Sequence, residues 1–119
     1  MKTALAALLF VPCCALAGDP WDTTDKALGG AALASTLLDW SQTRYIARHP
    51  DQYRELNPTL PDHPTTGRVD AHFAGSIIIG GLVANWLSSD YRKGFLSGVT
   101  VIEVSTVAHN YSVGIKMQF

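Results

Sequence analysis

The chain has 119 residues, and its nine lysine and arginine residues against ten aspartate and glutamate residues give a net charge of −1. This length suits one small domain. Without a concentrated basic surface, electrostatic binding to nucleic acid is excluded, and we expect no nucleic-acid partner.

The first segment of the chain has the three parts of a secretory leader. Lys2 supplies a positive charge, residues 4–11 form an unbroken apolar run, and Ala15-Leu16-Ala17 ends in a small-x-small pattern. The run is too short to span a hydrocarbon core of about 30 Å comfortably. We therefore predict a signal peptide at residues 1–17, cleaved after Ala17. An uncleaved first membrane helix is the alternative.

Both cysteines, Cys13 and Cys14, lie inside this leader. A lipid anchor on one of them is a further alternative, although such a site prefers a small residue directly before the cysteine. A mature chain that starts at Gly18 contains no cysteine. It then needs no disulfide in an oxidising compartment and has no thiol for catalysis.

A first helix is predicted over residues 25–49. Thr23-Thr24-Asp25 offers capping oxygens at its start. Within it, small and polar residues recur every four positions and form a row along one side. That row consists of Ala27, Ala31, Ser35, Asp39, Thr43 and Ala47.

The next segment, residues 50–68, is predicted to be a loop. It contains four prolines, which exclude a continuous helix. Its most distinctive part is Glu55-Leu56-Asn57-Pro58, where Pro58 forces Asn57 into an extended conformation and starts a turn.

Two further helices are predicted over residues 69–89 and 93–113, joined by a short polar turn over 88–92 as an antiparallel hairpin. Residues 73–89 carry no charge and are the best candidate for a membrane span. Rows of small residues recur in both helices. Such rows let helix backbones approach closely, and they include His72, Ser76, Gly80 and Ala84 in one helix and Gly94, Gly98, Ile102 and Thr106 in the other.

Together these elements predict one all-α domain over residues 18–119, a three-helix bundle embedded in a membrane. Lysine and arginine near the helix ends weakly favour an inner-membrane protein whose mature N-terminus faces the periplasm. A soluble periplasmic helical domain is the alternative.

Ionisable residues inside otherwise apolar helices form a candidate polar cluster. A carboxylate in the middle of an apolar helix is costly, and it tends to mark a functional interior or an ion path. The predicted cluster consists of Asp39, Thr43, Glu103, His72, His109 and Asn110. Carboxylates with a histidine suit zinc or a similar ion, while the simpler interpretation is that they pair with Arg44, a histidine or hydroxyl groups and hold the helices in register. No catalytic residue or cofactor is predicted.

Two resemblances follow from these motifs. Asp39 and Thr43 followed by Glu55, Asn57 and Pro58 resemble a set of small bacterial helical membrane proteins of unknown function. Trp21 with Asp25-Lys26 resembles a family of small exported envelope proteins, often lipoproteins, in which a histidine follows the Asp-Lys pair. This chain has Gly29-Gly30 there.

The function expected from the sequence is a structural, regulatory or partner-packing role in the cell envelope. Its partners would be the membrane and either a second copy of the chain or a membrane protein. One alternative is an ion- or metal-handling protein or enzyme that uses Asp39, Glu103 and a histidine. Another is a periplasmic binding module.

Overall fold

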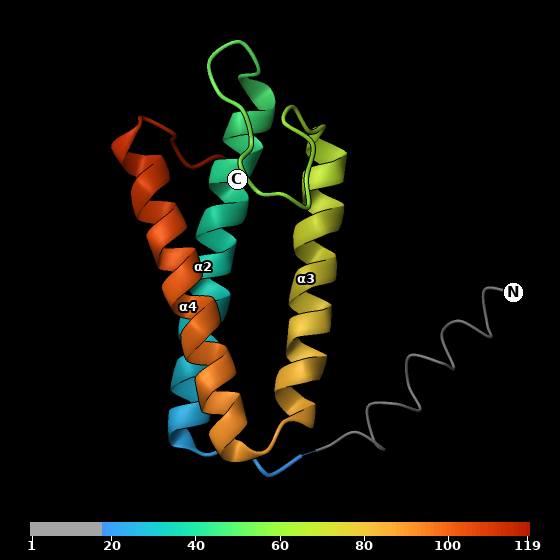
Figure 1. Cartoon of the computed structure of the whole chain (residues 1–119), viewed down its shortest axis with the longest axis vertical. Coiled ribbons are helices and arrows are strands. Elements are labelled where there is room, and N and C mark those ends of the chain that lie inside the picture. The colour runs from blue at the N-terminus through green and yellow to red at the C-terminus, as the bar shows by residue number, and fades with distance from the viewer. Residues whose placement is uncertain (1–17) are drawn as a thin grey trace, which may run out of the picture.

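The computed structural model describes residues 18–119, so the predicted leader and its cysteines lie outside the described residues. Three helices follow one another: α2 over Thr23–Arg48, α3 over Thr66–Trp86 and α4 over Ser89–Ser112. Residues 18–119 contain no strand. The prediction of an all-α, three-helix fold is therefore confirmed (Figure 1).

Helix α2 begins with a reciprocal cap. The Asp22 carboxylate accepts a hydrogen bond from the Asp25 N–H at 2.7 Å, and the Asp25 carboxylate accepts one from the Asp22 N–H at 3.1 Å. Both N–H groups would otherwise lack a partner at the start of the helix. The predicted cap lies within Thr23-Thr24-Asp25, but the capping residue is Asp22, one residue before that stretch, and Asp25 is its hydrogen-bond partner.

Helices α3 and α4 both begin earlier than predicted. The Thr65 hydroxyl caps α3 by accepting a hydrogen bond from the Arg68 N–H at 3.2 Å. Helix α4 starts at Ser89, so the predicted polar turn over 88–92 is wrong, and only residues 87 and 88 separate the two helices. The negative charge of Asp90 suits the first turn of α4, where the helix dipole is positive.

Helix α2 is the central element of the bundle. It packs most extensively against α4 and also against α3, whereas α3 and α4 make few contacts with each other. In Figure 1 the helices converge where α3 connects to α4, and α3 and α4 diverge towards the opposite end. One residue from each helix forms the small apolar core near the convergent end: Ala32, Ala84 and Leu96.

At the opposite end, polar groups help to join α2 to its neighbours. The Trp40 ring stacks on Phe73 of α3 with 5.9 Å between centroids, and its Nε1 donates to Asp70 at 2.7 Å. The fully buried Gln42 amide donates to the Val107 carbonyl of α4 and accepts from Asn110, both at 3.2 Å. Because these buried groups have partners, they fix the rotation of the helices about their axes without a large desolvation cost.

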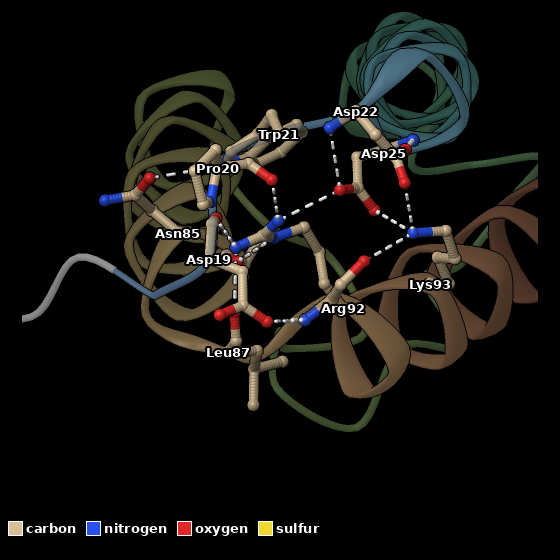
Figure 2. Close-up of polar contacts among 11 residues, drawn as sticks. Asp19, Pro20, Trp21, Asp22, Asp25, Asn85, Leu87, Arg92 and Lys93 are labelled. Carbon is tan, nitrogen blue, oxygen red and sulfur yellow. Dashed lines mark hydrogen bonds and ion pairs between the residues drawn. The ribbon is translucent and has the colours of Figure 1, made fainter.

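The convergent end is held by Arg92 of α4, whose side chain is fully buried (Figure 2). Its guanidinium donates to the carbonyls of Ala84 at 2.7 Å, Leu87 at 2.8 Å and Asp19 at 2.7 Å. It also pairs with the Asp25 carboxylate at 3.0 Å. Arg92 therefore joins all three helices to the segment that precedes α2.

The same cluster contains a second cation, Lys93. Its ammonium lies 3.1 Å from the buried Asp25 carboxylate and 2.8 Å from Asp22. Burial raises the pKa of Asp25, but hydrogen bonds from the Asp22 N–H, Lys93 and Arg92 outweigh burial and leave this pKa below its ordinary value. Asp25 is therefore a carboxylate with two cationic partners, which makes its burial tolerable.

The rows of small residues do not all face a neighbouring helix. Ser35, Asp39 and Thr43 of the α2 row are buried, but Gly94 and Gly98 of the α4 row are exposed. A Cβ atom added at Gly80, Gly94 or Gly98 would meet nothing within 4 Å. The prediction that these glycines bring helices of the chain into close contact is therefore wrong, because their Cα atoms face open space rather than a neighbouring helix.

Along residues 18–119, no helix combines the length and the apolar character needed to cross a membrane. The membrane-embedded part of the predicted fold stays a prediction.

Candidate functional site

Two carboxyl groups from different helices meet in the middle of the bundle. Asp39 of α2 is buried, with 7% of its surface exposed, and Glu103 of α4 is half-buried beside it. Burial, together with the hydrogen bond to Glu103 and its charge, raises the pKa of Asp39 to about 8. Burial also raises the pKa of Glu103, against the opposing effects of the bond from Asp39 and of His72. At neutral pH, protonated Asp39 therefore donates a hydrogen bond to the Glu103 carboxylate.

The groups around this carboxyl pair come from α2, α3 and the loop between them. The Thr43 hydroxyl, one turn after Asp39, donates to the Asp39 carboxyl at 3.5 Å. His72 of α3 is close enough to lower the pKa of Glu103, and the charge of Glu55 in the loop helps to raise that of Asp39. The negative charges of Glu103 and Glu55 near Asp39 favour its protonated form.

The loop motif is folded back onto this cluster. Glu55 Oε1 accepts hydrogen bonds from the backbone N–H groups of Leu56 at 3.0 Å and Asn57 at 2.8 Å. The Asn57 amide nitrogen lies 3.5 Å from Nε2 of His72, and its oxygen accepts from the Thr59 N–H at 3.0 Å. The turn at Asn57-Pro58 thus orients an amide towards the histidine. Pro58 itself is exposed in the turn.

The structure therefore brings together four predicted helical residues, Asp39, Thr43, His72 and Glu103, with Glu55 and Asn57 of the loop. Of the partners predicted for Asp39, the Thr43 hydroxyl is present, whereas Arg44 faces Asp70 at 3.5 Å instead. His109 is exposed, and Asn110 is buried against Gln42 instead. These last two residues lie two turns beyond Glu103 on α4, too far along the helix to reach the carboxyl pair.

Metal binding at this cluster is not supported. Among the described residues, no group of three or more His, Cys, Asp or Glu side chains is arranged to hold a metal ion.

A cavity of about 590 Å³ adjoins the carboxyl pair and has lining residues from α2, α3 and α4. Its walls are mainly apolar side chains and glycines, and Glu103 is its one acidic lining residue. Several lining residues, among them Gly30, Leu33 and Gly81, are exposed, so the cavity opens to the surface. Pockets of this size and character are typical sites for small molecules.

Sequence reasoning missed the cavity and the buried Arg92. Inward-facing glycines and outward-facing ones look alike in a four-residue repeat, so the pattern gave no sign of a hollow between the helices. Arg92 follows a polar stretch that resembles a turn. The one available signal was the Asp22-x-x-Asp25 spacing, which fits a helix cap and leaves an acidic partner for a cation.

No protein-family model, curated protein or solved structure matches the chain.

Proposed function

We propose that this protein binds a small, largely apolar molecule in the cavity between its three helices. The observation that carries the proposal is the cavity itself, with a volume of about 590 Å³, apolar walls and one carboxyl group. Such a site removes apolar surface of a ligand from water, and one polar group can fix the orientation of that ligand.

The glycines on the cavity wall support this role. Gly30, Gly80 and Gly81 line the cavity, and an added Cβ at each would meet nothing within 4 Å. A glycine inside a helix costs about 1 kcal/mol relative to alanine. Among the described helices, no close contact requires glycine at these positions, but the absence of a side chain enlarges the space available to a ligand.

A cavity-filling variant tests the proposal. Gly80→Leu places a side chain in the cavity and favours the helix, so binding should fall without loss of folding. Gly75→Leu is the matched control, because Gly75 is on the same helix, has equally open surroundings and does not line the cavity. With octan-1-ol as the probe, isothermal titration calorimetry should show that Gly80→Leu binds at least tenfold more weakly than the natural protein. Gly75→Leu should bind as tightly as the natural protein. Equal affinities for the natural protein and Gly80→Leu would contradict the proposal.

A second candidate function is self-association, the partner-packing role expected from the sequence. Large apolar side chains on the outer sides of α3 and α4 are each more than half exposed: Ile78, Ile79, Val101, Ile102 and Val104. The exposed Gly94 and Gly98 precede the apolar residues of α4 and would let another helix approach closely. These features fit a second copy of the chain.

We also propose that the protein works in the cell envelope, either in the inner membrane or in the periplasm. The support is the leader-like sequence of residues 1–17. Sequencing of the N-terminus of the expressed protein and carbonate extraction of membranes would test cleavage and membrane association together.

A further inference from the structure

One end of the cavity is polar, and three helices contribute to it. Thr36 of α2, Ser76 of α3 and Glu103 of α4 are the lining residues farthest along each helix from the Arg92 cluster. The opposite end is formed by aromatic and small residues, among them Trp21, Phe95 and Gly29. From the level of Phe95 to that of Glu103 on α4 the cavity is about 12 Å long, at a rise of about 1.5 Å per helical residue.

Glu103 is the group at this polar end with spare acceptor capacity. Glu103 is half-buried and lines the cavity, so part of its side chain faces the cavity. A carboxylate has about four acceptor positions, and the bond from Asp39 uses only one of them. The charge of Glu103 is thus held in a mainly apolar wall and is incompletely paired.

From this arrangement we infer that the ligand is an aliphatic primary amine, whose ammonium group binds the Glu103 carboxylate while its chain extends towards Trp21 and Phe95. The inference rests on the proposed binding function. An ammonium group offers three donors and a positive charge, which complement a partly desolvated carboxylate. A chain of eight carbons suits the length of the cavity.

The other charged groups near the cavity agree with this orientation. Glu55 in the loop adds negative charge at the Glu103 end, where Asp39 on α2 is neutral at pH 7, and His72 on α3 lies there as well. Lys26 lines the cavity at the far end and is exposed. Its positive charge opposes an amine bound in the reverse direction, and a fatty acid would need to place its carboxylate there.

Binding of the amine is expected to release a proton. An ammonium group beside Glu103 favours the ionised form of both carboxyl groups. Asp39, which has a pKa of about 8 and is protonated at pH 7, then loses its proton to the solvent. Asp39 does not line the cavity, so it acts through Glu103 as a positioning residue.

The test is isothermal titration of the full chain at pH 7 with octylamine, octan-1-ol and octanoate. Each titration is run in phosphate and in Tris, whose different heats of ionisation reveal proton release. Octylamine should bind at least tenfold more tightly than octan-1-ol and release up to one proton. Glu103→Gln should abolish this preference and still bind octan-1-ol. Asp39→Asn should keep the preference but release no proton, and Asp51→Asn, an exposed loop control, should match the natural protein.

The outcomes separate the two proposals. If octan-1-ol binds and octylamine binds no better, or if octanoate binds best, the amine inference is wrong and the binding function stands. If Glu103→Gln keeps the full preference for the amine, the inference is wrong as well. If none of the three probes binds, both the inference and the binding function fail.

Discussion

Replacement of Asp39 by asparagine should change how the stability of the protein depends on pH. Asp39 has an ordinary pKa of 3.8 and a pKa of about 8 in the folded protein. Such a carboxyl stabilises the fold most at a pH below 3.8, and this stabilisation is lost as the pH rises towards 8. Each pH unit in this window lowers the free energy of unfolding by about 1.4 kcal/mol.

The asparagine amide keeps a donor for Glu103 but cannot ionise, so the variant should not show the loss of stability that ionisation of Asp39 causes as the pH rises. Between pH 5 and pH 8, the free energy of unfolding of Asp39→Asn should rise relative to the natural protein by up to about 4 kcal/mol. That change is large beside the typical total stability of about 5–15 kcal/mol.

Urea unfolding at several pH values between 5 and 8, followed by the helical circular dichroism signal, measures this difference. Asp51→Asn removes an exposed carboxylate from the loop and should follow the pH dependence of the natural protein. If Asp39→Asn and the natural protein lose stability in parallel as the pH rises, Asp39 is not held in its protonated form and the reasoning about the carboxyl pair is refuted.

Two further predictions concern the ends and the outer surface of the bundle. Arg92→Met should lower the midpoint of thermal unfolding by about 10 °C or more, because it removes the donors to four backbone carbonyls and to Asp25. The control is Arg54→Met, at an exposed arginine. Equal midpoints for Arg92→Met and the natural protein would contradict a stabilising role for Arg92. Ile102→Lys should abolish self-association in sedimentation velocity, because it places a charge in the exposed apolar surface of α4. If the natural protein is monomeric at all concentrations, the proposed self-association is refuted.

The sequence by itself determined the positions of the helices closely. Prolines between α2 and α3 exclude a helix there, and Asp22 and Thr65 each cap a helix whose partner N–H lies three residues further on. These effects act over one turn of the chain. Even so, the sequence predicts the first cap at Thr23-Thr24-Asp25 and none for the second helix, which begins three residues before the expected residue 69. The errors at α4 came from its first turn, whose polar residues also suit a turn between helices.

The meeting of Asp39 with Glu103, and the exclusion of Asn110 from their site, were decided by the tertiary structure. Residues of one helical face share a direction, but the rotation of α4 against α2 decides which of them reaches a given partner. That rotation depends on contacts between residues far apart in the chain, such as Gln42 with Asn110 and Arg92 with Asp25. The arrangement of the three helices likewise placed Ser76, Gly80 and Ala84 of the α3 row in the wall of a cavity, because open space between helices has no signature in residue spacing.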